Sequence, residues 1–252
     1  MSFNIGIIGG TDSSGGSGLT ADEETILHYE CNAVPVISAI TFQTPTAKPR
    51  IFPVPGNGFS SQLDSLLTQP LDAIKIGMLP DTQCIEDLGR FLDQVKCDKI
   101  ILDPVKNTST GHGLISEKGW AALIKDLLPK ISLITPNFEE ALSLLGLIRT
   151  HDIIPVTLAK ECLKLGSQAV LLKGGHINDP KMSTDFLITQ SPKAEAFSYP
   201  RINGGSDVRG TGCRLATAIA CEWAKGRDLI NAVQNAGKYL QGYIQSSLTS
   251  TA

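Results

Sequence analysis

The sequence lacks the features that mark several classes of protein. Its longest apolar runs, such as Ile100-Ile101-Leu102, are far shorter than the roughly 20 residues of a membrane-spanning helix. It has no run of lysine and arginine, and its net charge of −3 at pH 7 argues against a general nucleic-acid binder. The N-terminus has no basic region followed by an apolar stretch, so we expect no secretory signal and no contact with membranes.

Patterns typical of metal sites and disulfides are also missing. The 6 cysteines form no C-x-x-C pair, and the 4 histidines are equally scattered along the chain. Such spacing argues against a disulfide framework and against a zinc or histidine-based metal site. It indicates reduced core thiols in a cytoplasmic protein. The cysteines are Cys31, Cys84, Cys97, Cys162, Cys213 and Cys221, and the histidines are His28, His112, His151 and His176.

Short apolar runs rich in valine and isoleucine alternate with amphipathic stretches along the 252 residues. This alternation predicts an α/β fold in which helices cover both faces of a mostly parallel sheet. No linker and no internal repeat is evident, so we expect a single domain, residues 1–252. Strands are expected at residues 4–8, 34–41, 73–76, 99–102, 133–135 and 169–173, with an edge hairpin at 185–189 and 194–199. Helices are expected at residues 21–29, 58–67, 83–94, 117–127, 138–145, 155–164, 213–225 and 229–248.

The first of these helices carries a start signal. Thr20 and Glu23 have the spacing of a capping box, in which each side chain accepts a hydrogen bond from the other residue's backbone amide. This spacing predicts that the helix begins at that point.

The most informative motif is Gly210-Thr211-Gly212-Cys213, directly before a helical run. Two glycines let the backbone turn sharply and approach a ligand closely. The helix that follows points unpaired amides and a partial positive charge at the same place, which suits a phosphate. Cys213 at that helix start is expected to have a lowered pKa and to act as a base or nucleophile. The alternative is a tight turn with a half-buried cysteine.

Polar and glycine-rich segments follow the six expected strands in turn, and ligands in open α/β sheets bind beyond the carboxyl ends of the strands. Residues 9–18 contain five glycines but fit neither a dinucleotide fingerprint nor a P-loop. We therefore expect a loop that wraps a ligand rather than a flexible turn. The other segments are Gln43, Gly77-Met78, Asp103-Pro104, Pro136-Asn137 and Gly174-Gly175-His176.

Charged residues at these strand ends point to phosphate and metal chemistry. Asp103 ends a buried strand and Glu139-Glu140 open a helix, so they can hold Mg²⁺ through water while the metal binds phosphate. Stabilisation of the helix start explains one of the two glutamates. Lys173 precedes two glycines, and we favour a phosphate contact over a plain surface position. Gln43 can read the edge of a flat heterocycle, although such a residue is more often part of a loop.

Together these motifs resemble the hydroxymethylpyrimidine/phosphomethylpyrimidine kinases of thiamine biosynthesis, which belong to the ribokinase-like superfamily. The matching segments lie in family order and span nearly the whole chain. Most ribokinase relatives have an aspartate in place of Cys213, so this residue narrows the resemblance to the pyrimidine kinases and their vitamin-kinase cousins. The segments are residues 9–22, 75–79, 103–105, 133–141, 173–176 and 210–213.

The resemblance implies a three-layer α/β/α sandwich, a homodimer and two reactions that use ATP and Mg²⁺. ATP phosphorylates 4-amino-5-hydroxymethyl-2-methylpyrimidine on its hydroxymethyl oxygen, and a second ATP converts the monophosphate to the diphosphate. The resemblance assigns the pyrimidine pocket to Gly10, Asp22, Gln43, Met78 and Val105. It assigns Mg²⁺ to Asp103 and Glu140, ATP to Lys173 and Asn137, and the anion hole to Gly210, Thr211, Gly212 and Cys213, with Cys213 near the substrate oxygen.

Some positions depart from the family pattern. Residues 44–46 differ from the usual continuation after Gln43, and Lys106 stands beside the presumed pocket where an apolar residue is usual. Arg209 and Arg214 flank the anion hole, and their charge can favour a phosphorylated substrate or mark a changed preference. The alternatives are therefore a pyridoxal/pyridoxine kinase on the same fold and a non-catalytic pyrimidine-binding sensor. The intact motifs argue against the sensor.

Overall fold

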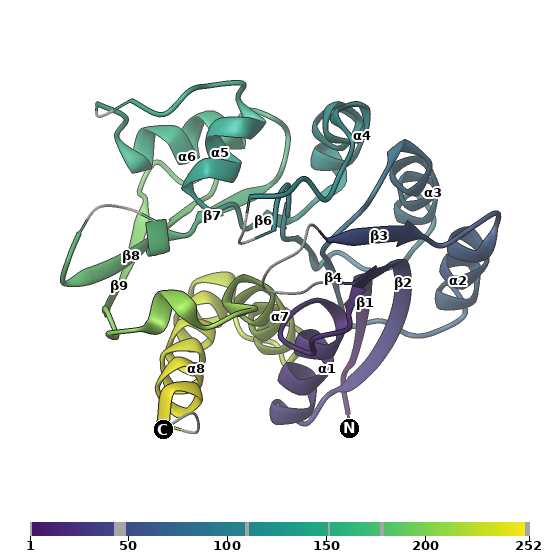
Figure 1. Ribbon diagram of the computed structural model, residues 1–252, viewed down its shortest axis with the longest axis horizontal. Coiled ribbons are helices and arrows are strands. Elements are labelled where there is room, and N and C mark those ends of the chain that lie inside the picture. The colour runs from purple at the N-terminus through teal and green to yellow at the C-terminus, as the bar shows by residue number, and fades with distance from the viewer. Residues whose placement is uncertain (1, 43–48, 109–110, 151, 177–178, 250–252) are drawn as a thin grey trace.

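The computed structural model describes residues 2–42, 49–108, 111–150, 152–176 and 179–249. Within them, one nine-stranded sheet has the order β3-β2-β1-β4-β5-β6-β7-β8-β9 (Figure 1). The pairings from β2 through β7 are parallel, whereas β3, β8 and β9 join through antiparallel pairings. The strands are β1 (Asn4–Asp12), β2 (Asn32–Phe42), β3 (Arg50–Pro53), β4 (Ala73–Ile76), β5 (Ile100–Leu102), β6 (Leu133–Ile134), β7 (Ala169–Leu172), β8 (Met182–Ile188) and β9 (Glu195–Pro200).

Helices cover both faces of the sheet (Figure 1). α1, α7 and α8 pack on one face, and α2 to α6 pack on the other. α4 continues as a π-helical turn, Leu123–Leu127, and a short 3₁₀ turn, Leu128–Lys130. The helices are α1 (Gly18–His28), α2 (Gly58–Leu66), α3 (Thr82–Leu92), α4 (Glu117–Ala122), α5 (Phe138–Leu144), α6 (Pro155–Leu163), α7 (Thr211–Ala224) and α8 (Leu229–Thr249). Among the described helices, none is long and apolar enough to cross a membrane.

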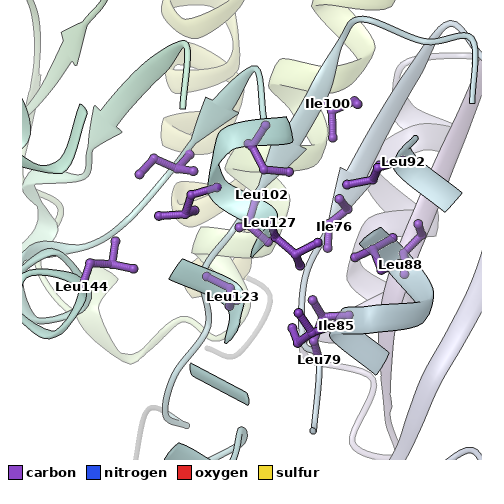
Figure 2. Packing of buried hydrophobic residues seen from close by; sticks show 14 of the residues in the cluster. Ile76, Leu79, Ile85, Leu88, Leu92, Ile100, Leu102, Leu123, Leu127 and Leu144 are labelled. Atoms are coloured by element: carbon purple, nitrogen blue, oxygen red, sulfur yellow. The ribbon is translucent and has the colours of Figure 1, made fainter. Parts of the chain in front are cut away.

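Alternate residues of the central strands contribute to two separate cores. Ile7 of β1 packs with α1, α7 and α8, whereas Ile76 of β4 and Leu102 of β5 pack on the opposite face. Figure 2 shows this second core, where Leu88 of α3 and Leu127 gather around the two strands. Burial on both faces explains why these strands are mainly apolar, with Lys75 of β4 as a charged exception. The rigid sheet thereby fixes the positions of the strand ends that carry the site.

The predicted three-layer α/β/α architecture is confirmed. The strand at residues 73–76 lies where it is predicted, and the edge hairpin is present as β8 and β9. β3 was not predicted, because a four-residue edge strand with mostly exposed side chains carries no clear alternation. β1 extends beyond the predicted residue 8, because its pairing with β2 continues to Asp12.

The predicted start of the first helix is wrong. α1 begins at Gly18, with Ser17 at the N-cap position, so Thr20 lies inside the helix and does not cap it. Gly18 has a φ of 62°, and a Cβ at this position would lie 2.4 Å from the Gly10 carbonyl oxygen. The glycine therefore lets α1 begin directly against β1, three residues earlier than the capping-box spacing indicates.

Candidate active site

The carboxyl ends of the parallel strands open on two adjoining cavities. The smaller one has a volume of about 60 Å³ and is lined by β1, β4 and α1. The larger one is a cleft of about 1780 Å³ that extends from the end of β5 to the start of α7 and to α8. Ser17, Val105, Leu114 and Cys213 line both, so the two cavities meet at these residues.

The small cavity gathers most of the residues assigned to the pyrimidine pocket. Gly10, Asp22, Met78 and Val105 all line it, together with Cys213. A Cβ at position 10 would lie 2.9 Å from the Met78 sulfur, so this glycine keeps the two walls close without a clash. Gln43, the fifth residue assigned to this pocket, lies outside the described residues.

An ion pair lies at the base of this cavity. The Lys75 Nζ atom is 2.7 Å from Asp22 Oδ2, and both side chains are only 1% exposed. Thr217 of α7 donates a hydrogen bond of 2.7 Å to Asp22 Oδ1. Burial alone would lower the pKa of Lys75, but the adjacent Asp22 carboxylate raises it above its usual range. Lys75 is therefore a buried ammonium that links β4 to α1.

The start of α7 forms the predicted anion-binding turn. Gly210 is the N-cap of this 14-residue helix and has a φ of 71°, in the left-handed region that favours glycine. The amide of Arg214 donates to the Gly210 carbonyl oxygen, so the amides of residues 211–213 precede the first bond within the helix. A Cβ at Gly212 would lie 3.2 Å from Lys173 Nζ, which shows how closely this backbone approaches the charged group.

We expect Gly210→Ala to abolish most activity through backbone displacement. An alanine Cβ would lie 2.2 Å from the Gly16 carbonyl oxygen, so one of the two loops must move. Gly15→Ala is the matched control, because Gly15 has a similar φ of 72° but a Cβ added there would meet nothing within 4 Å. Left-handed strain costs about 1–2 kcal/mol in both variants. Thermal unfolding and activity measured together should show the larger loss only in Gly210→Ala, and equal losses would contradict the steric argument.

Two carboxylates and one lysine form a charged cluster across from this turn. Lys173 Nζ lies 2.7 Å from Asp103 Oδ1 and 3.8 Å from Glu140 Oε2. Burial alone would lower the pKa of Lys173, but Asp103 and Glu140 raise it. Burial raises the pKa of Glu140 to about 7, although Lys173 opposes the shift. The cluster thus brings together three residues that the sequence places 30 or more positions apart.

Asn137 orients the Glu140 carboxylate. The two residues form a capping box at the start of α5, in which the Asn137 amide donates to Glu140 Oε2 and the Glu140 amide donates to Asn137 Oδ1. Glu139 instead pairs with Arg149 at the surface, so it is the glutamate that plays no part in the cluster. Among the described residues, no group of three or more Asp, Glu, His or Cys side chains is arranged to hold a metal ion.

The Cys213 thiol differs from the prediction made for it. Its pKa is raised, because burial is the largest influence and Asp22 and Asp103 add negative charge, while Lys75 and the Gly18 amide lower it. The predicted lowering of the Cys213 pKa was therefore wrong, because the loss of hydration on burial outweighs the favourable effect of the helix N-terminus on the thiolate. Cys213 nevertheless lies where expected, at the junction of the two cavities.

Lys106, Arg209 and Arg214, the three charged residues that depart from the family pattern, lie in different surroundings. Lys106 donates to Ser143 Oγ and lines the large cleft, but it is not among the described residues that line the small cavity. Arg214 is buried away from the anion-binding turn, where it pairs with Glu24 and lies 4.1 Å from the centre of the Tyr243 ring. The prediction that both arginines flank the turn is thus confirmed only for Arg209.

Two site residues escaped the sequence analysis. Lys75 appears there only as part of a motif, although a lysine in the middle of a buried strand is itself a signal of a paired charge. Asp12 appears only as part of a loop, yet it is buried and accepts hydrogen bonds from Ser14 and Ser17. These bonds lower its pKa despite the opposing effect of burial.

Comparisons with known proteins agree with this site. The family model described as phosphomethylpyrimidine kinase matches residues 12–252. A hydroxymethylpyrimidine/phosphomethylpyrimidine kinase from Aquifex aeolicus is 33% identical over 245 residues, which cover 95% of this chain and 93% of that protein. The crystal structure of a phosphomethylpyrimidine kinase from Clostridium difficile 630 superposes with a TM-score of 0.82 at 28% identity, covering 96% of this chain and 100% of the other.

A second solved structure belongs to a related vitamin kinase. The pyridoxal kinase from Staphylococcus aureus in complex with AMP-PCP and pyridoxal superposes with a TM-score of 0.85 at 27% identity, covering 96% of this chain and 87% of that one. The likeness confirms the fold and the kinase class. The family match and the identity along almost the entire sequence show that the chain is a kinase and belongs to the phosphomethylpyrimidine kinase family.

Proposed function

We propose that this kinase transfers a phosphoryl group from ATP to the hydroxymethyl oxygen of 4-amino-5-hydroxymethyl-2-methylpyrimidine, and then another to the monophosphate, in thiamine biosynthesis. The observation that carries the proposal is the meeting of the two cavities at Cys213. The small cavity, with Gly10 and Met78 in its walls, suits a flat ring. The cleft beyond it holds the lysine and carboxylates that phosphate chemistry needs.

The proposed roles follow from the charge that develops during phosphoryl transfer. The transferring group spreads negative charge over its oxygens, so catalysis depends mainly on positioning and electrostatic stabilisation. Lys173 stays protonated and lies beside Gly212, so it would meet the phosphates of ATP as they reach the turn. The amides of residues 211–213 would stabilise the same oxygens from the helix side.

The charged cluster fits a magnesium ion. Asp103 and Glu140 supply the oxygen ligands that Mg²⁺ prefers, and in the structure the Lys173 ammonium offsets part of their negative charge. Two carboxylates without further ligands suit an ion that keeps several waters and is bound jointly with substrate phosphates. Asn137, through its capping box, would orient Glu140 and lie near the nucleotide. When bound, the ion would neutralise charge on the phosphates.

Cys213 is proposed to accept the proton of the substrate hydroxyl in the first transfer. The acceptor in the second transfer is already a phosphate, so it needs little help from a base. Because the Cys213 pKa is raised, the thiol is protonated at neutral pH and its thiolate fraction rises as the pH increases. The first transfer should therefore become faster between neutral and alkaline pH.

We expect Cys213→Ala to lower the rate of the first transfer by roughly 10²–10⁴-fold, the range typical of general base catalysis. The second transfer should lose much less, and the alkaline rise of the first should disappear. We would measure kcat for each acceptor over roughly pH 6–9, a range that includes neutral pH, at saturating ATP and magnesium. Cys97→Ala is the control, because Cys97 is a partly buried thiol outside both cavities. Equal losses in the two transfers would contradict the role of Cys213 as the base of the first transfer.

Two further parts of the proposal concern organisation. We propose that residues 1–252 act as a single domain, which is supported by one sheet with both cores packed on it. We also propose a homodimer, on the ground of the family resemblance. A single unfolding transition of the purified chain would support the single domain. A sedimentation mass twice that of the monomer would support the homodimer.

A further inference from the structure

Arg209 links the two loops that border the site. Its NH1 atom donates to Ser14 Oγ at 2.7 Å, and its NH2 atom lies 3.1 Å from Asp12 Oδ2. A Cβ added to Gly16 would lie 3.4 Å from the Arg209 Cβ atom, so the backbones of the two loops are also close. Arg209 therefore sits directly before the anion-binding turn and directly over the glycine-rich loop.

This position is next to the junction of the two cavities. Asp12 Oδ2, the oxygen that pairs with Arg209, also accepts a hydrogen bond of 2.6 Å from Ser17 Oγ. Ser17 is one of the residues that line both cavities, and Arg209 itself lines the cleft. The guanidinium is thus separated from the junction by a single carboxylate.

The cations around the junction differ in how accessible they are. All three cations are paired with buried carboxylates, but the Lys75 side chain is 1% exposed and the Lys173 side chain 13% exposed. The Arg209 side chain is 39% exposed, so it is the one of these three that an incoming anion can reach most readily. The planar guanidinium of Arg209 can also donate two parallel hydrogen bonds to a phosphate, which a lysine ammonium cannot do.

The two proposed acceptors differ in charge, and this difference gives Arg209 a distinct role. The unphosphorylated pyrimidine is uncharged at its hydroxymethyl group, whereas a phosphate monoester carries about −1.5 to −2 charges at neutral pH. That second acceptor must enter a site whose two largely buried lysines are already paired, Lys75 with Asp22 and Lys173 with Asp103. A more exposed cation beside the junction would offset the added negative charge.

We propose that Arg209 is a specificity-determining residue that recognises the phosphate of the monophosphate acceptor in the second transfer. The inference rests on the proposed function and deepens it. In this proposal Arg209 binds the charged acceptor and Cys213 accepts the proton of the neutral one, so the two steps depend on different residues beside the same junction.

The test compares kcat and KM for the pyrimidine and for its monophosphate, with ATP and magnesium, in Arg209→Gln and the unmodified chain. Loss of a charge-assisted hydrogen bond should raise KM for the monophosphate roughly 10- to 100-fold and change KM for the neutral pyrimidine less than about threefold. Arg209→Lys should recover part of the monophosphate affinity because it restores the charge. Arg227→Gln is the matched control, because it removes the charge of an exposed arginine that pairs with Glu222 and is not among the described residues lining either cavity.

Salt provides a readout that a purely structural role would not change. In the unmodified chain, KM for the monophosphate should rise with ionic strength while KM for the neutral pyrimidine stays nearly constant. The rise for the monophosphate should be shallower in Arg209→Gln and should persist in Arg209→Lys, which keeps the charge. Equal losses for both acceptors in Arg209→Gln, or equal salt dependence, would reduce Arg209 to a link between loops and overturn the inference alone. Failure of the unmodified chain on both pyrimidines would overturn the proposed function as well.

Discussion

Replacing Lys173 by methionine should lower kcat for both phosphoryl transfers by roughly 10²–10³-fold, the loss typical of removing one preorganised group that stabilises transition-state charge. Lys173 lies 2.7 Å from Asp103, and among the described atoms its Nζ is the only cationic group within 4 Å of a Cβ built at Gly212. Both transfers use the same ATP phosphates. The loss should therefore be similar for the two acceptors, unlike the losses expected for Cys213 and Arg209.

Single-turnover kinetics with each acceptor measures this effect directly. Lys164→Met is the control, because it removes an exposed lysine that pairs only with its neighbour Glu161 on the described surface of α6. Its kcat should stay within about twofold of the unmodified chain, as surface pairs contribute little. A Lys173→Met variant that keeps more than a tenth of kcat would remove Lys173 from the proposed mechanism.

The second large effect concerns stability. Asp22→Ala should reduce the free energy of unfolding by about 3–5 kcal/mol, because it leaves the Lys75 ammonium buried without its carboxylate. The Thr217 hydroxyl also loses its acceptor in this variant. A double variant, Asp22→Leu with Lys75→Met, removes both charges and should recover much of the lost stability.

Urea unfolding of the three proteins provides the numbers. Glu161→Ala breaks the exposed pair with Lys164 and serves as the control, with an expected change below about 1 kcal/mol. An Asp22→Ala change as small as that of the control would mean that the ammonium of Lys75 is hydrated or deprotonated. The buried ion pair would then not be what fixes α1 against β4.

The layers of the fold were predictable because individual segments carry the apolar pattern of a buried strand or the amphipathic pattern of a helix. Residues 169–172 are a short apolar run, residues 73–76 are apolar except for Lys75, and both are buried strands with parallel pairings. The start of α1 was not predictable in this way. The Gly18 backbone at the start of α1 lies against the Gly10 carbonyl of β1, and this tertiary contact overrides the local capping signal at Thr20. β3 likewise exists only through its pairing with β2.

The site was predictable as far as residue types and strand ends could indicate it. Asp103, Glu140 and Lys173 carry obvious phosphate and metal chemistry, and the sheet brings them together. The local environment of each group was not predictable. The Cys213 pKa depends on how deeply the thiol is buried and on the distant residues Asp22 and Asp103, so a rule for helix ends predicts the wrong direction. Arg214 turns away from the site because Glu24 and Tyr243 bind it elsewhere.

The most direct test of the central claim is an end-point assay with ATP and magnesium. Hydroxymethylpyrimidine, its monophosphate and pyridoxal are offered separately, and the products are identified by mass. We expect the pyrimidine diphosphate from either pyrimidine acceptor. Phosphate transferred only to pyridoxal would contradict the proposed substrate. The small cavity, with Gly10, Asp22 and Met78, would then be a pyridoxal site.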